Sequence, residues 1–138
     1  MNRSEIESAI PHRSPMLLVD EVVEKSDNHI IAKKTFHADE FFLQGHYPDN
    51  PIVPGIILCE ASMQTGAILL SQFGGEGTPV ATRMNDVRFR KIVRPGDTIE
   101  IRADLTERLS NAFFMKAKVT VDGKVAVRFE FACALAVD

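Results

Sequence analysis

One segment, residues 56–73, constrains the fold of this chain more than any other. It has no proline, it contains a single internal glycine, Gly66, and it ends at Gly74-Gly75, a pair that commonly stops a helix. Plotted at 3.6 residues per turn, it carries apolar side chains on nearly every side, and a helix of that kind is buried all round. The sequence therefore predicts one long helix enclosed by the rest of the chain.

The remaining segments have the turns and the alternation of β-strands. A capping-box pattern at Ser4 predicts a short first helix, and Val121-Asp122-Gly123-Lys124 is typical of a type I′ hairpin. Strands are expected within residues 16–24, 30–36 and 80–137. We therefore predict an α+β fold and a single domain over residues 1–138. About six strands, mostly antiparallel, would form a sheet that wraps around the long central helix.

Composition excludes several classes of protein. The net charge of −3 argues against a general nucleic-acid binder, and we noted no apolar run approaching the ~18 residues of a membrane span. The first residues lack the apolar stretch of a signal peptide, so a cytoplasmic location is expected. The two cysteines, Cys59 and Cys133, are too few for a thiolate zinc site and are expected to be buried.

Two polar residues interrupt the apolar helix. Glu60 and Gln64 lie one turn apart, so their side chains project from the same face. Burying a carboxylate is costly unless it is paired, hydrogen-bonded or protonated, and apolar surroundings favour the protonated form. Glu60 is therefore a candidate general acid, although a structural carboxyl at the helix surface would give the same pattern.

His46 is the candidate general base. It lies in residues 41–55, where three prolines fix the backbone, and histidine titrates nearest to working pH. His29 follows a cluster of turn residues, and His37 ends a predicted strand. His12 is the only rival, and its expected role is to hold the N-terminal turn.

The start of the long helix supplies a third element. Its free amides, beginning at Gly55, are placed to receive a carbonyl oxygen on which negative charge develops, and Gly55 has no side chain to block that approach. A base, a protonated acid and these amides suit removal of a proton next to a carbonyl with protonation of a departing hydroxyl. No phosphate-binding loop, GxSxG elbow or clustered set of metal ligands occurs in the sequence, so no cofactor or metal is expected.

Four stretches of the chain resemble the (3R)-hydroxyacyl-[acyl carrier protein] dehydratases of type II fatty acid synthesis, which have the hotdog fold. They are IPHRSPMLLVD at residues 10–20, the loop of residues 42–54 with GHYP and PIVP, the helix start at residues 55–64, and VRFR with VRPGD in residues 87–97. The match runs nearly end to end and keeps the histidine loop and the glutamate helix in order.

This resemblance implies roles for the matching residues. His46 is then the catalytic base, Glu60 the acid, Gln64 a residue that orients the site, and the Gly55 amide a donor to the thioester carbonyl. Three further residues are expected in the loop or in the hydrophobic tunnel for the acyl chain: Tyr47, Pro54 and Met63. The resemblance also implies a homodimer in which His46 of one chain meets Glu60 of the other, and dimers that commonly assemble into hexamers.

The resemblance implies an acidic acyl carrier protein as the partner, which delivers the substrate on a phosphopantetheine arm. Residues 83–94 are locally basic in a mildly acidic chain. Four of their cations are expected to form a landing patch for the carrier, although an ordinary solvated face gives the same pattern: Arg88, Arg90, Lys91 and Arg94. Neither nucleic acid nor membrane is expected as a partner.

Two departures from the family's pattern leave the substrate open. Asp49-Asn50 stands where glycine is usual, and Met63 stands where a small residue is usual, which adds bulk near the tunnel. The sequence therefore does not decide the length of the acyl chain that is accepted. It also leaves two pathways open, housekeeping fatty acid synthesis and a specialised lipid or polyene pathway. Three other activities also stay open: a hotdog thioesterase, which typically lacks this histidine loop; a non-catalytic acyl-binding protein; and a dehydratase-isomerase, whose family has aspartate at the position of Glu60.

Overall fold

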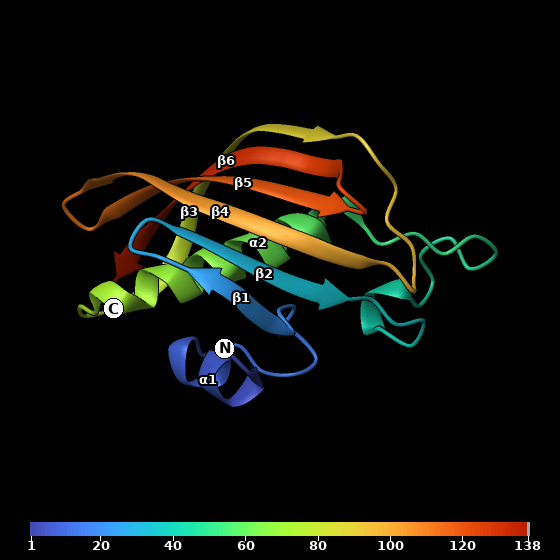
Figure 1. Cartoon of the computed structure of the whole chain (residues 1–138), viewed down its shortest axis with the longest axis horizontal. Coiled ribbons are helices and arrows are strands. Elements are labelled where there is room, and N and C mark those ends of the chain that lie inside the picture. The colour runs from blue at the N-terminus through green and yellow to red at the C-terminus, as the bar shows by residue number, and fades with distance from the viewer. Residues whose placement is uncertain (138) are drawn as a thin grey trace.

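The computed structural model describes residues 1–137 and contains one long helix packed against one sheet (Figure 1). The elements in chain order are α1 Arg3–Ala9, β1 Glu21–Lys25, β2 His29–Thr35, a 3-10 turn Phe41–Leu43, α2 Gly55–Leu70, a 3-10 turn Ser71–Phe73, β3 Thr78–Phe89, β4 Thr98–Leu109, β5 Ala112–Val121 and β6 Lys124–Ala136. The long helix was predicted at this place, and Gly74, at φ 64°, ends the turn that extends it.

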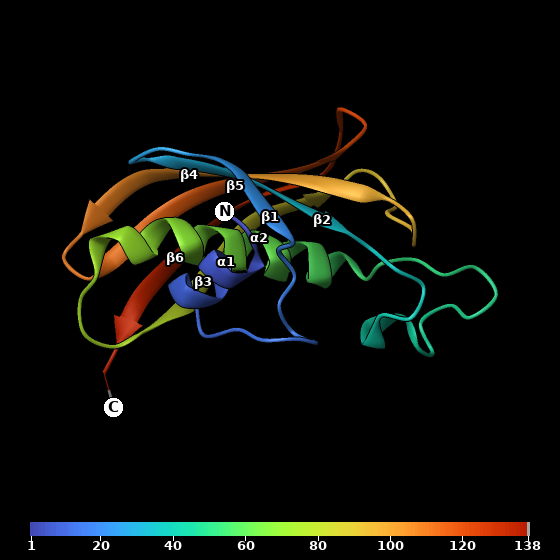
Figure 2. The same cartoon turned by 60° about the horizontal axis from the view of Figure 1, so that its bottom comes forward.

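The six strands form a single antiparallel sheet in the order β1-β2-β4-β5-β6-β3. The sheet curves over α2, which lies along its inner face (Figure 2). The prediction of an α+β hotdog fold, with an antiparallel sheet around one central helix, is confirmed. The type I′ hairpin is also present, because Asp122 and Gly123 both have positive φ angles of 50° and 78°.

Close packing holds α2 against the sheet. Leu58, Ile68 and Leu69 are fully or almost fully buried, and each such side chain contributes roughly 1.5–3 kcal/mol through the removal of apolar area from water. A Cβ atom on Gly66 would lie 2.8 Å from the ring of Phe131, so the internal glycine marks a closest approach of helix and sheet. Ile56 differs from the expectation of a helix buried all round, because its side chain in the first turn is 61% exposed.

Local structure near the N-terminus differs from two expectations. The capping box of α1 is formed by Asn2 and Glu5, so it begins two residues before Ser4, where it was predicted. Strand β1 begins at Glu21 and not near residue 16, because the amides of Met16 and Leu17 bond to the carbonyl of Arg13 in a turn.

The apolar residues at the start of the histidine loop, residues 41–43, are buried only in part. Leu43 is buried, whereas Phe41 is 43% exposed and contacts the ring of Phe42 edge-on. The loop is therefore secured at this end by Leu43 and Phe42.

Strand β3 leaves a long edge of the sheet open. It spans 12 residues, pairs only with β6, and is exposed along most of its length. Val80 and Phe89 are 39% and 56% exposed on it. A long, accessible edge of this kind is a surface on which another strand can pair.

One helical segment, Gly55–Phe73, has the length and hydropathy of a membrane span, contrary to our expectation that no run approaches that length. Its most apolar window is 61% buried within residues 1–137. Burial of this extent is what the core helix of the sheet requires, so its apolar character is explained by the fold.

Candidate active site

The His46 ring is fixed by its own loop. Its Nδ1 atom lies 2.8 Å from the carbonyl oxygen of Ile52, and because a carbonyl only accepts, Nδ1 carries the proton. The lone pair of the neutral ring is then on Nε2. Tyr47, which has φ 52° and is 62% exposed, contacts this ring edge-on. The loop thus presents a base with a defined tautomer.

The histidine loop is tied to the segment that follows β3. The buried Val53 donates its amide to the carbonyl of Val93 at 2.8 Å. The guanidinium of Arg94 donates from Nη1 to Oδ1 of Asn50, and Nη1 also lies 3.5 Å from the carbonyl oxygen of Pro51. Asn50, in the Asp49-Asn50 pair that departs from the family's usual glycine, supplies the acceptor for Arg94 and so helps to tie the loop down.

The first turn of α2 follows directly from this loop, with Pro54 as its N-cap. The amide of Ile57 bonds to the Pro54 carbonyl, while those of Gly55 and Ile56 have no acceptor within residues 1–137. A Cβ atom on Gly55 would lie 2.5 Å from the ring of Phe89. Glycine is needed here because an aromatic ring of β3 lies over the helix start, a reason that the sequence did not show.

Glu60 lines a small hollow of about 80 Å³ in the next turn of α2. The hollow is formed by His12, Glu60, Met63, Gln64, Ala67, Pro79, Ala81 and Cys133. The Glu60 side chain is 32% exposed, so it is less buried than the apolar helix suggested. Met63 was predicted near the acyl chain, and it lies beside Glu60 in this hollow.

Gln64 is hydrogen-bonded to the Glu60 carboxyl, and its whole side-chain amide is in use. Its Nε2 donates to Glu60 Oε2 at 2.9 Å and to the Met16 carbonyl at 2.8 Å. Its Oε1 accepts the amide of Leu18 at 2.7 Å. Gln64 is 1% exposed, and these three bonds allow only one orientation of its amide. The arrangement gives Gln64 the geometry of an orienting residue.

The chain does not bring His46 and Glu60 together by itself. No hydrogen bond or ion pair joins them within residues 1–137, and His46 does not line the hollow around Glu60. The histidine loop projects beyond the end of α2 (Figures 1 and 2). The hollow instead includes Pro79 and Ala81 of the open strand β3.

The structure places a different histidine next to Glu60. His12 Nε2 lies 4.0 Å from Glu60 Oε2, and both side chains are about one-third exposed. Sequence reasoning gave His12 only a role in the N-terminal turn. The available signal for a role at the site was the position of His12 in the IPHR stretch, which is one of the stretches that carry the family resemblance.

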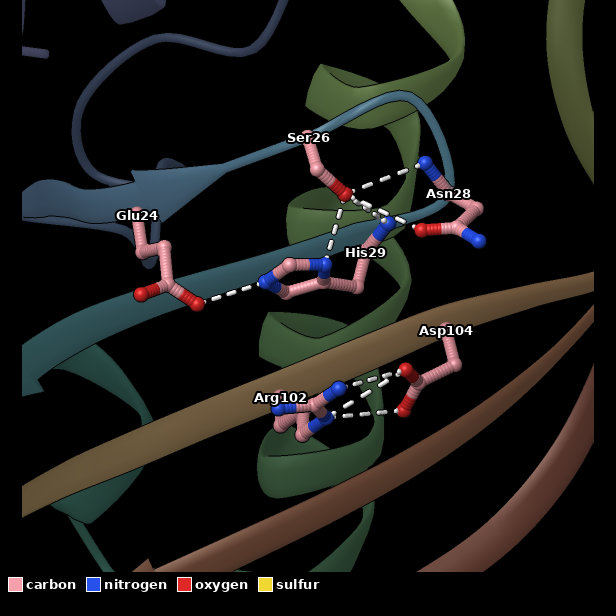
Figure 3. Close-up of polar contacts among 6 residues, drawn as sticks. All are labelled: Glu24, Ser26, Asn28, His29, Arg102 and Asp104. Atoms are coloured by element: carbon pink, nitrogen blue, oxygen red, sulfur yellow. Dashed lines mark hydrogen bonds and ion pairs between the residues drawn. The ribbon is translucent and has the colours of Figure 1, made fainter.

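The other two histidines lie away from this hollow. His29 is on the outer surface of the sheet, where its ring contacts Ser26 through Nδ1 and Glu24 through Nε2 (Figure 3). The neighbouring Arg102 is held by Asp104 in the same view. His37 is exposed after β2.

The two cysteines are buried, as predicted. Burial raises the pKa of Cys59 and of Cys133 to about 11. Cys133 lines the hollow, but at neutral pH its thiol remains protonated and unreactive. Residues 1–137 contain no group of three or more histidine, cysteine or acidic side chains arranged to hold a metal ion.

The chain is similar to curated and solved proteins along nearly its whole length. A family model described as a FabA-like domain matches residues 10–130. A 3-hydroxyacyl-[acyl-carrier-protein] dehydratase FabZ of Clostridium perfringens is 41% identical, with 98% of this chain and 99% of that protein covered. A FabZ of Oenococcus oeni is 42% identical, with 91% and 93% covered.

Solved structures share the fold at lower identity. The dehydratase heterocomplex ApeI:P from Xenorhabdus doucetiae has a TM-score of 0.83 at 19% identity, covering 96% of this chain and 91% of that one. A hypothetical thioesterase with coenzyme A from Streptococcus pneumoniae has a TM-score of 0.70 at 14% identity, with 96% and 92% covered.

The fold, together with the near full-length dehydratase relatives, defines an enzyme of the hydro-lyase class. Within that class, the chain belongs to the FabA-like family.

Proposed function

We propose that this chain removes water from a (3R)-hydroxyacyl group on acyl carrier protein and leaves the trans-2-enoyl product in fatty acid synthesis. The observation that carries the proposal is the pair of polar groups, each fixed by hydrogen bonds: His46 with a free Nε2, and Glu60 held by Gln64. Relatives that share 41–42% of their residues with this chain are named as dehydratases of this substrate class.

The elimination needs one base and one acid. His46 Nε2 takes a proton from the carbon next to the thioester carbonyl, and Glu60 gives a proton to the hydroxyl on the next carbon as its C–O bond breaks. The electron pair of the broken C–H bond forms the new double bond, and the hydroxyl leaves as water. The amides at Gly55 and Ile56 are free to receive the carbonyl oxygen as negative charge develops there.

A homodimer completes the site in this proposal. The loop with His46 projects beyond the start of α2 (Figure 2), His46 does not line the hollow around Glu60, and that hollow is bordered by the open edge strand β3. A second chain paired along β3 would bring its own loop toward this hollow, with its His46 serving this chain's Glu60. Assembly of such dimers into a trimer of dimers remains a prediction from the resemblance.

The acyl chain is assigned to the apolar side of the hollow. A cavity of about 200 Å³ adjoins it, and the two share Ala67, Pro79 and Cys133. Its other lining residues are largely apolar and include Leu70 and Phe113. Met63 borders the hollow at the Glu60 end, so its bulk is placed to affect the length of chain accepted.

The carrier protein is assigned to the basic end of β3. Arg88, Arg90 and Lys91 are exposed on either side of Phe89, whose ring lies over the start of α2. Arg94 of the proposed patch also bonds the histidine loop, so it would serve both the carrier surface and the loop. A cytoplasmic location and a single domain over residues 1–138, of which residue 138 lies outside the described part, complete the proposal.

A substrate assay distinguishes this activity from thioester hydrolysis. The purified protein is incubated with 3-hydroxyacyl-[acyl carrier protein] of several chain lengths, and enoyl absorbance and free thiol are followed together. We expect enoyl product without thiol release, and a loss of about 10²–10⁴-fold in turnover for His46→Ala and Glu60→Gln in folded protein. Thiol release without enoyl product would favour the thioesterase, and near-normal turnover of either variant would refute the assigned roles.

A further inference from the structure

The hollow around Glu60 holds a histidine that the mechanism above does not use. His12 Nε2 faces Glu60 Oε2 at 4.0 Å, which is longer than a hydrogen bond. Catalytic hydrogen bonds are often long in sites without substrate and tighten when it binds. This contact is therefore a candidate for a second bond to the Glu60 carboxyl, beside the one from Gln64.

The backbone around His12 is firmly held. The Arg13 guanidinium donates to the carbonyls of Glu7, Ile10 and His12 at 2.8–2.9 Å. It thereby donates to carbonyl groups at the end of α1 and in the turn that follows. Ile10 is 3% exposed and fixes the same segment against the core. The position of the His12 ring next to Glu60 is thus set by the fold and not by a free loop.

The two nitrogens of His12 are in different surroundings. Nδ1 is buried and has no hydrogen-bond partner within residues 1–137, whereas Nε2 faces the carboxyl. A buried N–H without an acceptor is costly, so the proton belongs on Nε2, which faces the Glu60 carboxyl at 4.0 Å. His12 and Gln64 then both direct an N–H group at the same oxygen, Oε2.

We propose that His12 is a positioning residue for Glu60, and that Oε1, the oxygen not held by Gln64 or His12, carries the proton given to the departing hydroxyl. When that proton leaves Oε1, the carboxyl becomes a carboxylate, and the N–H of Gln64 stabilises the new charge on Oε2, joined by the N–H of His12 once the 4.0 Å contact tightens. The inference rests on the proposed role of Glu60 as the acid.

Two amide side chains of different length test which nitrogen of His12 matters. In His12→Gln the amide nitrogen reaches about as far as Nε2, and in His12→Asn it reaches only the place of Nδ1. We expect His12→Gln to keep turnover within about threefold of wild type. His12→Asn and His12→Ala should lower kcat by about 10- to 100-fold, the effect of losing a hydrogen bond to a charged group, with KM changed less than about twofold.

Thermal unfolding of each variant separates a folding defect from a loss of positioning, and the Gln–Asn pair suffices if His12→Ala does not fold. The inference is overturned if His12→Asn turns over at the wild-type rate, if His12→Gln is impaired as much as His12→Asn, or if only KM rises. Normal turnover of Glu60→Gln would instead refute the acid assignment itself, and the inference with it.

Discussion

Replacing Gln64 by leucine tests the hydrogen-bonded support of the site. Leucine has nearly the same size, so packing along α2 is retained, but the amide of the fully buried Leu18 loses its acceptor. An orphaned buried N–H costs about 1–3 kcal/mol, and the lost bond to Met16 adds about 0.5–1.5 kcal/mol. The expected loss of unfolding free energy is therefore about 1.5–4.5 kcal/mol.

For a chain of this length, that loss corresponds to a fall in Tm of about 5–16 °C in a thermal scan. Glu60 also loses its donor, so kcat should fall in parallel by about 10-fold or more. Gln64→Glu keeps an acceptor for Leu18 and should lose less stability than Gln64→Leu, although it places a second carboxylate beside Glu60.

Gln72→Leu is the matched control, because Gln72 is exposed and donates only to the carbonyl of Asp27 at 3.2 Å. Its effect should stay within about 0.5 kcal/mol. If the Tm of Gln64→Leu equals the Tm of the Gln72→Leu control, the amide of Leu18 has found another acceptor. Gln64 would then not be needed to hold the segment of residues 16–18.

Two further predictions concern the thiols and the basic end of β3. Burial raises the pKa of Cys59 and Cys133 from 9.0 to about 11, so the folded state holds those protons more tightly and stability should fall as pH rises from about 9 to about 11. If the stability of the double variant Cys59→Ala, Cys133→Ala falls as steeply over this pH range, the prediction is contradicted. Arg90→Glu or Lys91→Glu should raise KM for carrier-linked substrate, more so at low salt, and should leave turnover of a short thioester mimic unchanged. Equal losses of activity on both substrates would show that these residues support the fold and not the carrier contact.

The sequence was sufficient to predict the elements that local chemistry determines. Each of three features has one favoured local structure: the apolar run of α2, its glycine stop and the Asp122-Gly123 turn. All three are present as predicted. The start of β1 was misplaced because the amides of residues 16–18 bond to Arg13 and Gln64, which are not strand partners. Neither the local turn to Arg13 nor the bond to Gln64, which is 46 residues away, leaves a periodic signal in the sequence.

The candidate site shows the same division. His46, Glu60 and Gln64 could be selected from residue type and spacing, and Gln64 and Glu60 are indeed bonded. The 32% exposure of Glu60 and the approach of His12 depend on how residues 10–20 pack across α2, which spacing along the chain does not report. The ring of Phe89 over Gly55 is a long-range contact of the same kind.

In the proposed dimer, each active site needs His46 from one chain and Glu60 from the other, and mixed dimers test this requirement most directly. Chains with His46→Ala and chains with Glu60→Gln, each carrying a different affinity tag, are co-expressed, and the heterodimer is purified through both tags. One of its two sites then contains both native residues, so we predict about half of the wild-type turnover per dimer, while each variant alone stays inactive. A purified heterodimer as inactive as its parents would contradict the claim and require a site built within one chain.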